Sequence, residues 1–469
     1  MKKDFKTIDC DWLIRQTGDP FADIGGYVIK YLLEREPEKD ILQLIEEATL
    51  IYVNNWEGKL HSFFHGSKIT NPSIKTSNEK IKGTIKLFNQ IISDEGHFQE
   101  GYCRISGRKA KLYSAGRESL ILSGSGSFIN FHHTFQSGLM LSKEILIRMF
   151  FIPLGSILLN GKIASIYSNI PEITEFFVVE NCKNNLRSLG LNVEVGVLKS
   201  EFHNPANALF NFIDKVITNV HLASDSNLPI SLSLYLFSNF GASTEMNVYR
   251  IPAKVFGFYR YCKNGEFCDH WQKFIYSHYS SSAFKGAKFN PDAQTYEFEK
   301  KGETGSVGLD DFKIWTNRIY IKLLNDQSLI PDFLRWSRTH KFNFLIIETY
   351  QISVRNMKKE TVSKIKELAK YLVKDQNADS IKKRIMSLNG AKNSYLLRRY
   401  LLSDVVARNY NEGGGLMISV DDYVNYLFTD DISWQEIRDL LLIAVYQELH
   451  ELKLNVLIEL SEPETTEVE

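Results

Sequence analysis

The residues that could carry out chemistry are few and lie far apart in the sequence. His132 and His133 are the one pair of adjacent histidines, and the sequence places no carboxylate or thiol beside them to complete a metal site. Pairs of aspartates begin expected helices, where their charge favours the helix dipole; they lie at 310–311, 421–422 and 430–431. The Walker phosphate loop, the Gly-x-Ser-x-Gly motif and the His-Glu-x-x-His zinc helix do not occur. The sequence therefore predicts no catalytic residue, no metal and no other cofactor.

The five cysteines do not form a recognisable set. Their odd number and wide spacing argue against a framework of disulfides. Cys262, Cys268 and His270 are close enough in sequence to suggest a metal site, but zinc needs a fourth ligand that this segment does not supply. We therefore expect the two thiols to lie in the core on either side of a turn at Asn264 and Gly265.

Charge is distributed unevenly along the chain. The formal net charge is zero, from 56 basic and 56 acidic residues. Residues 355–399 nevertheless contain 13 Lys or Arg against 4 Asp or Glu, while residues 401–469 contain 3 against 15. Because local fields decide what a surface attracts, the average does not exclude a nucleic-acid partner. A run of like charges is equally compatible with a solvated helix face.

Basic residues are interspersed with aromatic and amide residues in two segments, 61–75 and 103–117. Lys and Arg in such segments could bind phosphates, and Asn and Ser could reach base edges. Charge and loop position together give eight candidate DNA-binding residues in these two segments: Lys68, Asn71, Lys75, Arg104, Arg108, Lys109, Lys111 and Arg117. The basic stretch 355–399 adds two more candidates, Lys364 and Lys370.

Hydrophobic periodicity indicates the elements that position these residues. Asp19 can cap a helix that has Pro20 at its first position. Gly25 and Gly26 inside this helix would cost stability unless another segment packs closely against them. Residues 231–237 alternate in hydrophobicity as a half-buried strand does. Strand and helix patterns are mixed in this way to about residue 310, so the sequence predicts an α+β fold.

The chain divides by pattern into three parts. Residues 1–310 are expected to form a mixed α/β domain, interrupted at 93–150 by an irregular, loop-rich insertion that is rich in Gly, Ser, Arg and Lys. The pattern also predicts a helix at about 143–151 that ends at Pro153. Residues 311–460 have helical periodicity, with Ser433 and Glu436 at the spacing of a capping box, and predict a helical bundle. Residues 461–469 contain four Glu and one Pro and are expected to be a disordered acidic tail.

Apolar runs are too short to suggest a membrane span. None approaches the ~20 residues that a spanning helix needs, and the longest candidate, 145–154, contains Arg148 and Pro153. The first residues lead into no apolar signal core. The sequence therefore predicts a cytoplasmic protein with no membrane partner.

Collinear segments between residues 17 and 255 carry a resemblance to a known family. They include Thr-Gly-Asp-Pro-Phe-Ala-Asp-Ile-Gly-Gly at 17–26, Thr-Asn-Pro-Ser at 70–73 and Ser-Gly-Ser-Gly-Ser-Phe-Ile-Asn-Phe at 123–131. They also include Ile-Pro-Leu-Gly at 152–155 with Tyr-Ser-Asn at 167–169, and Phe-Ser-Asn-Phe-Gly at 237–241 with Tyr-Arg-Ile-Pro at 249–252. In their sequence and order these segments resemble the large subunits of type I-B CRISPR Cascade complexes, a family with two Cys-x-x-Cys motifs.

The chain departs from this family at the zinc ribbon that the two Cys-x-x-Cys motifs form. The first motif corresponds to residues 103–107 and keeps Cys103 alone, and the second corresponds to residues 142–145, which begin with Ser142. One thiol of four cannot form a tetrahedral zinc site. The resemblance therefore implies a degenerate, metal-free ribbon within residues 93–150.

The resemblance implies a binding role without catalysis. Such subunits find a protospacer-adjacent motif in duplex DNA, open the duplex and hold the displaced strand, while pairing with guide RNA reads the sequence. The implied partners are the guide-RNA ribonucleoprotein backbone, target double-stranded DNA, and a recruited helicase-nuclease or transposition proteins. The helical C-terminal part resembles the small subunit of these complexes, which relatives can also make from an internal start, and Met357 is a candidate start here.

Two other functions remain open on the sequence alone. A metal-dependent nuclease would use His132, His133 and the aspartates. A structural scaffold would make no contact with DNA, in which case neutralising Arg104, Arg108 and Lys109 would leave DNA binding by the complex unchanged.

Overall fold

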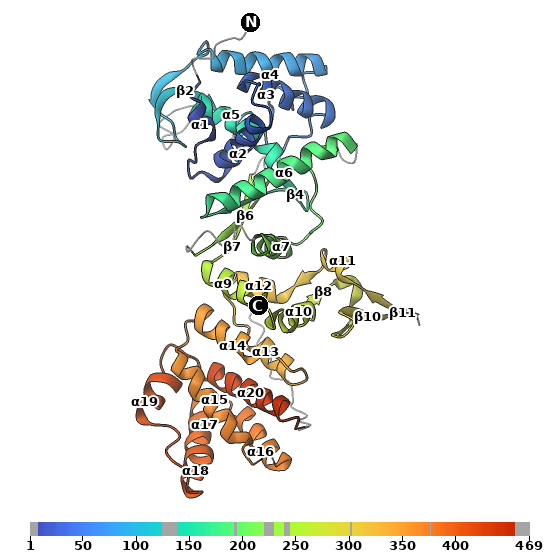
Figure 1. Ribbon diagram of the computed structural model, residues 1–469. Coiled ribbons are helices and arrows are strands. Elements are labelled where there is room, and N and C mark those ends of the chain that lie inside the picture. The colour runs from blue at the N-terminus through green and yellow to red at the C-terminus, as the bar shows by residue number, and fades with distance from the viewer. Residues whose placement is uncertain are drawn as a thin grey trace. The chain divides into compact units, whose positions relative to one another are not determined.

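The computed structural model is an α+β protein, as the sequence predicted (Figure 1). The structure describes residues 8–123, 138–191, 195–219, 229–238, 244–300, 303–375 and 377–454. The chain divides into two compact units, of which unit 1 comprises Met1–Ala253 with Leu309–Thr316 and unit 2 comprises Lys254–Gly308 with Asn317–Glu469. The sequence placed the end of the first domain at residue 310, whereas unit 1 ends at Ala253 apart from Leu309–Thr316. The strands between residues 279 and 307 belong to unit 2.

Unit 1 contains helices and two antiparallel sheets, with strand orders β1-β2-β3 and β4-β5-β6-β7. Strand β6 corresponds to the strand that the alternation at 231–237 predicted. The described elements of this unit are α1 (Cys10–Ile14), α2 (Pro20–Arg35), α3 (Ile41–Leu50), η1 (Ile51–Asn55), α4 (Ser77–Ile92), β1 (Gln99–Tyr102), β2 (Lys109–Ala115), β3 (Leu139–Ser142), α5 (Lys143–Phe151), η3 (Ile152–Gly155), β4 (Ile157–Leu159), β5 (Lys162–Ser168), α6 (Pro171–Leu191), α7 (Pro205–Thr218), β6 (Leu232–Ser238), β7 (Glu245–Ile251) and α11 (Leu309–Phe312).

The two glycines inside α2 allow α5 to cross it at very short range. A Cβ atom at Gly25 would lie 1.9 Å from the carbonyl oxygen of Arg148, and one at Gly26 would lie 2.6 Å from the Arg148 guanidinium. Neither position has room for a side chain. The sequence predicted a close neighbour for these glycines but did not indicate that α5 supplies it.

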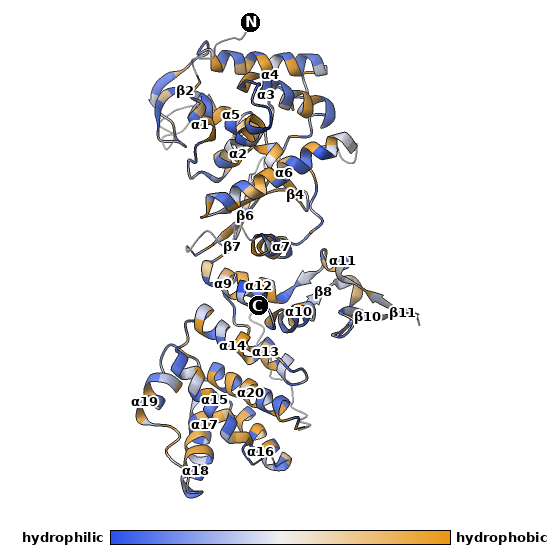
Figure 2. Cartoon of the chain, in the orientation of Figure 1, coloured by the Kyte–Doolittle hydropathy of each residue, from blue (hydrophilic) through white to orange (hydrophobic). Residues whose placement is uncertain are grey.

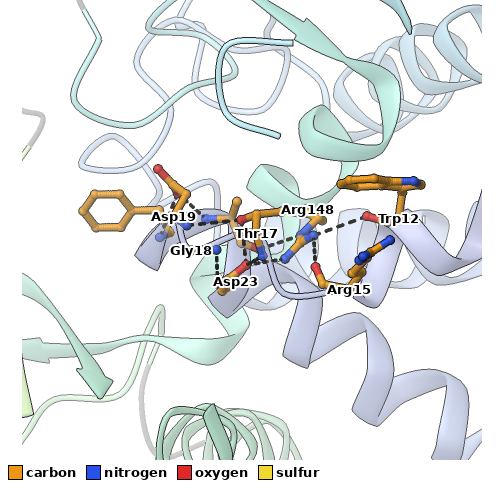
Figure 3. Close-up of polar contacts among 9 residues, drawn as sticks. Trp12, Arg15, Thr17, Gly18, Asp19, Asp23 and Arg148 are labelled. Atoms are coloured by element: carbon orange, nitrogen blue, oxygen red, sulfur yellow. Dashed lines mark hydrogen bonds and ion pairs between the residues drawn. The ribbon is translucent and has the colours of Figure 1, made fainter. Parts of the chain in front are cut away.

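Arg148 is fully buried beside Asp23 of α2 (Figure 3). Its Nη2 donates to Asp23 Oδ1 at 2.7 Å, its Nε donates to the carbonyl of Ala22 at 2.7 Å, and its Nη1 donates to the carbonyls of Trp12 and Arg15 at 3.3 and 2.7 Å. A buried charge needs such complete pairing, since an unpaired one is strongly destabilising. Arg148 thereby joins α1, α2 and α5.

The segment before α2 completes the shell around Asp23. The backbone N–H and hydroxyl of Thr17 both donate to Asp23 Oδ1 at 2.7 Å, and the N–H of Gly18 donates to Oδ2 at 3.0 Å. Asp19 caps α2 as predicted, because its Oδ1 accepts from the N–H groups of Phe21 and Ala22. Within residues 17–26, the first segment of the family resemblance, residues 22–26 are therefore buried in the core of unit 1.

Residues 152–155, another segment of the resemblance, pack against neighbouring helices. A Cβ atom at Gly155 would meet Ile24, Val28 and Val178 at 2.8–2.9 Å, so the 3-10 turn η3 lies directly between α2 and α6. The Nδ2 of Asn185 donates to the carbonyl of Leu154 at 2.9 Å and fixes the turn to α6.

The expected insertion at 93–150 is more regular than the sequence indicated. Strands β1, β2 and β3 form a sheet, and every residue of α5 is buried. The helix predicted at about 143–151 is confirmed, and it belongs to the core and not to a loop-rich insertion. Residues 124–137 lie outside the described part of the chain.

The two segments that correspond to the Cys-x-x-Cys motifs meet around one thiol. Cys103 is buried in the turn between β1 and β2, where the N–H of Gly107 donates to its carbonyl at 2.9 Å. Burial raises the pKa of the Cys103 thiol, but hydrogen bonds from Ser106, Ser142 and Ile105 outweigh burial and lower that pKa overall. Donors from both segments thus surround the remaining sulfur.

Unit 2 combines a helical bundle with two small sheets, of orders β11-β10-β9 and β12-β8. Its described elements are α9 (Ala253–Cys262), α10 (Phe267–Tyr276), β8 (Tyr279–Ser280), η4 (Ser282–Phe284), β9 (Lys288–Asn290), β10 (Thr295–Lys300), β11 (Glu303–Val307), β12 (Thr316–Asn317), α12 (Arg318–Leu324), α13 (Ile330–Ser337), α14 (Phe344–Thr349), η5 (Tyr350–Val354), α15 (Lys359–Val373), α16 (Ala378–Asn389), α17 (Ser394–Arg399), η6 (Tyr400–Ala407), α18 (Arg408–Asn411), α19 (Val420–Asp422), η7 (Tyr423–Leu427) and α20 (Trp434–Glu451).

Helix α20 lies at the centre of the bundle and contacts α13, α15, α16 and α17. Its residues 440–445 are all buried, so it is hydrophobic around most of its circumference. Ser433 caps it as predicted, accepting from the N–H of Glu436 at 3.2 Å. The carboxylate of Glu436 accepts from Gln351 Nε2 at 2.9 Å and so joins α20 to η5.

The cysteines of unit 2 flank a turn, as expected. Gly265, with φ of +50°, lies between α9 and α10, and the N–H of Phe267 donates to the carbonyl of Asn264 at 3.1 Å. Cys262 is fully buried, and burial raises its pKa well above the ordinary value, whereas Cys268 is half-buried. The prediction of a core thiol is confirmed for Cys262.

Within the described residues, no helix has both the length and the hydropathy needed to cross a membrane. The expected acidic tail at 461–469 lies outside the described residues, as do His132 and His133 and residues 239–241 of the family resemblance.

Candidate nucleic-acid interface

The two basic segments of unit 1 meet at one hydrogen bond. The backbone N–H of His65 donates to the carbonyl of Arg117 at 2.8 Å, which joins the loop 65–75 to the turn 116–119 that follows β2. Lys68, Lys75 and Arg117 are exposed, and in the described part of the chain their side chains form no hydrogen bond or ion pair. We call Lys68, Asn71, Lys75 and Arg117 the loop-pair surface.

Asn71 lies in a turn that its own side chain stabilises. Its Oδ1 accepts from the N–H of Ser73 at 2.9 Å, while Thr70 Oγ1 donates to the carbonyl of Phe64 at 2.6 Å. The amide NH₂ of Asn71 stays available as a donor, since its acceptor oxygen is the atom that the turn uses. The loop therefore presents a positioned amide donor between two exposed lysines.

Two of the predicted contacts in the β1-β2-β3 sheet have partners inside the protein. Arg108 pairs with Asp9 at 2.9 Å and lies 5.2 Å from the ring centre of Trp12. Lys111 pairs with Asp94 at 3.1 Å and lies 4.5 Å from the ring centre of Phe98. Both side chains thus have local structural roles that the sequence did not indicate.

Asp94 is the centre of a small charged cluster beneath this sheet. Burial raises the pKa of Asp94, but hydrogen bonds from Lys143, Lys111 and Tyr113 lower it further than burial raises it, so the pKa lies below its usual range. The distances to Lys143 Nζ and the Tyr113 hydroxyl are 3.0 and 2.9 Å. Lys111 therefore contributes to the attachment of β2 to α4 and α5.

Arg104 and Lys109 complete the predicted set in unit 1. Both are exposed, and no ion pair of either side chain occurs among the described residues. They lie at the start of β2, whereas Arg117 follows its end. Since β2 has seven residues, the two groups are separated by roughly 20 Å. The structure thus divides the predicted residues of unit 1 into two separate surfaces.

The two predicted lysines of α15 differ from each other. Lys364 is largely buried, pairs with Glu367 at 2.7 Å and Asp422 at 3.2 Å, and donates to the carbonyl of Met417 at 3.0 Å. It fixes the segment 417–422 to α15. Lys370 is exposed and borders a hollow of about 470 Å³ together with Glu448 and other residues.

A group of cations that the predictions did not include lies on α16, on α17 and in the segment between them. Lys382, Lys383, Lys392 and Arg399 are exposed, and none has a hydrogen bond or ion pair within the ranges that the structure describes. We call these four residues, with Tyr395, the α16–α17 surface. The Tyr395 side chain is 70% exposed.

The elements of this surface are held together by Tyr400, at the start of η6. Its hydroxyl donates to the carbonyl of Arg384 at 3.2 Å, so the end of α17 contacts the middle of α16. Hydrophobic and hydrophilic residues alternate along these helices, as expected for helices with one buried face (Figure 2). The buried positions Ile381, Ile385 and Leu388 have helical spacing. That periodicity in the sequence was the signal that could have identified Lys382 and Lys383 as exposed.

Metal-binding geometry is absent from the described residues, where no group of three or more His, Cys, Asp or Glu side chains converges. The histidines of the nuclease hypothesis lie outside these residues.

Residues 335–469 match the DevT C-terminal domain. A search of curated proteins finds nothing similar to the chain. The matched range begins inside α13 and includes the whole α16–α17 surface.

Proposed function

We propose that the protein is the non-catalytic large subunit of an RNA-guided CRISPR type I-B surveillance complex. In this role it recognises the protospacer-adjacent motif, helps to unwind target DNA and stabilises the R-loop, so that a separate effector can be recruited. It acts in the cytoplasm with a guide-RNA ribonucleoprotein and a small subunit.

The observation that carries this proposal is the α16–α17 surface. Its cations have no partner within the described residues, so they can neutralise phosphates without first breaking an internal ion pair. The exposed ring of Tyr395 offers a face on which a base can stack. Arg399 follows Tyr395 by four residues on α17, so both lie on one helix face. Unpaired cations with an exposed aromatic ring suit a single strand, because its bases are free to stack, and the displaced strand of an R-loop is such a strand.

The loop-pair surface supports the part of the proposal that concerns duplex DNA. Lys68, Lys75 and Arg117 supply positive charge, and the Asn71 amide supplies a donor for a base edge or a phosphate. Phosphate contacts would set the register of the duplex, and the amide would contribute to recognition of the motif.

A small subunit made from an internal start at Met357 remains part of the proposal. Met357 lies directly before α15, so the fragment would contain α15 to α20. It would lack α13, which packs against α20 and accepts a hydrogen bond at the carbonyl of Ser337 from His450 Nε2 at 2.9 Å. An immunoblot of the purified complex that detects full-length chain alone would exclude this start.

The test of the proposed function is purification of tagged protein from cells that also express the neighbouring genes and a guide array. We expect a stoichiometric ribonucleoprotein that contains RNA of guide length and binds duplex DNA according to the flanking motif. A chain that purifies free of RNA in the presence of these partners would contradict the proposal. A complex that assembles with RNA but binds DNA equally well after neutralisation of both surfaces would favour the scaffold hypothesis.

A further inference from the structure

The loop-pair surface borders a cavity of about 430 Å³ in unit 1. Its described lining comes from the loop 64–71, α4, the end of β2 with the turn after it, and α5. The volume lies within the range of pockets that hold small molecules. Nothing in the proposed function accounts for a cavity at this position.

The walls of the cavity are largely aromatic. Phe64, Phe88, Tyr113 and Phe150 line it, and the rings of Phe88 and Phe150 have centres 4.7 Å apart. The Tyr113 hydroxyl is engaged with Asp94 at 2.9 Å, so this ring is fixed in place. Fixed rings of this kind favour a flat aromatic ligand over a flexible chain, because flat surfaces stack.

The mouth of the cavity is polar. Lys68, Asn71, Gln90 and Glu118 contribute to its lining, and Lys68 and Glu118 are exposed. The Asn71 amide donates and the Glu118 carboxylate accepts, so the mouth offers both kinds of hydrogen-bonding group. A ligand that matches it has an aromatic body with donors and acceptors on its edge, and Lys68 favours an attached negative charge.

We propose that this cavity receives one nucleobase that has been extruded from target DNA as the duplex opens. The base would stack among the aromatic rings, its edge would meet Asn71 and Glu118, and Lys68 would contact the adjoining phosphate. The cations of the loop-pair surface hold the duplex at the mouth, which is why a base of bound DNA fits better than a free small molecule. This inference rests on the proposed function, since it requires DNA at this surface.

Leu87 offers a way to fill the cavity without disturbing the core. It lies on the lining and is 37% exposed. The variant Leu87→Trp would occupy the mouth, and Leu50→Trp is a matched control, because Leu50 is 43% exposed on α3 and does not line the cavity. Asn71→Asp is a second variant that keeps the acceptor for Ser73 and removes the donor.

The experiment places 2-aminopurine at successive positions of a duplex beside the recognised motif and follows its fluorescence in the assembled ribonucleoprotein. Anisotropy of a distant dye reports DNA binding in the same sample. We expect one position to change its fluorescence several-fold on binding to wild type and to Leu50→Trp, to lose this change with Leu87→Trp, and to change its base preference with Asn71→Asp.

The outcomes separate this inference from the proposed function. If the duplex binds by anisotropy but no position depends on Leu87, the cavity does not hold a base and the proposed function stands. If no duplex binds to the assembled wild-type complex, the proposed function fails and the inference fails with it.

Discussion

The basic stretch 355–399 contains two groups of cations that differ in their partners. On α15, Lys364, Lys366 and Lys374 each pair with a carboxylate, and for Lys374 this is Glu412 at 2.7 Å. On α16 and α17, the four cations of the α16–α17 surface have no such partner in the described residues. The carboxylates of Glu412 and Asp422 come from the acidic stretch 401–469 and pair with Lys374 and Lys364, whereas Lys359 and Lys370 of α15 stay exposed.

This difference shows that the charge of a segment does not identify a binding surface. What matters is whether the cation already forms an ion pair with a carboxylate of the same chain, because that pair replaces part of its hydration shell. A paired cation can bind a phosphate only in competition with its partner. The predictions below test whether this distinction holds, in order of decreasing effect.

The largest effect should come from neutralising the α16–α17 surface with Lys382→Gln, Lys383→Gln, Lys392→Gln and Arg399→Gln together. We expect the affinity of the assembled complex for single-stranded DNA to fall by about 100-fold, and the slope of log affinity against log salt to decrease by ~3, since each phosphate contact on a single strand contributes about 0.7. The measurement is a salt titration by fluorescence anisotropy. The thermal stability should not change.

The control for this variant changes the same number of exposed cations elsewhere in unit 2, namely Arg260, Lys285, Lys288 and Lys359. Equal losses of affinity in the two variants would show that net charge alone matters, and the comparison between the two groups would then be wrong.

A smaller loss of affinity should follow from removal of the exposed ring. Tyr395→Ala is expected to weaken single-strand binding by about tenfold, or ~1.4 kcal/mol, whereas Tyr395→Phe should retain it, because stacking needs the ring and not the hydroxyl. Equilibrium binding at one salt concentration measures both. An equal loss for the two variants would mean that the hydroxyl, and not the ring face, makes the contact.

On α15, mutation should affect stability instead of binding. Lys364→Ala removes two ion pairs and the bond to the Met417 carbonyl, and we expect the free energy of unfolding to fall by about 1–2 kcal/mol. Chemical denaturation provides the measurement, with Lys382→Ala as the control that should change stability little. If Lys364→Ala weakens DNA binding as strongly as the α16–α17 variant does, Lys364 is a contact after all.

The smallest effect is a dependence of α15 packing on pH. Burial raises the pKa of Asp422, but hydrogen bonds from Ser419 and Lys364 outweigh it and hold the pKa below the ordinary value of 3.8. Because the pKa of Asp422 is lower in the folded protein, its ionised carboxylate stabilises the fold at pH values above the ordinary pKa of 3.8. This contribution to the free energy of unfolding is lost as the pH falls through the lowered pKa. We expect Asp422→Asn to lower stability by less than ~1 kcal/mol at neutral pH and by nothing in strong acid. Thermal unfolding across this pH range tests the sign.

The sequence indicated the α+β fold, the cap of α2 at Asp19 and the cap of α20 at Ser433, because caps and periodicity depend on neighbouring residues. It also located the loop that presents Asn71, since turn residues act locally. Helix α5 was predicted as a helix, but its contact with α2 and the unit boundary were not. Both depend on the packing of segments that are distant in the sequence.

The segments of the family resemblance lie in different environments. Segment 70–73 contains Asn71 of the loop-pair surface, whereas 17–26 and 152–155 include Gly25, Gly26 and Gly155, where neighbouring helices leave no room for a side chain. Exposed cations such as Lys382 are under no such packing constraint.

The sequence by itself determined where helices begin, which residues are charged and that Gly25 and Gly26 need a close neighbour. Only the tertiary structure decided that Arg148, more than 120 residues away, is that neighbour, and that Lys364 is paired while Lys382 is not. The reason is that local patterns depend on residues within a few positions, whereas the partner of a buried or paired charge is set by which distant segments the hydrophobic core brings together.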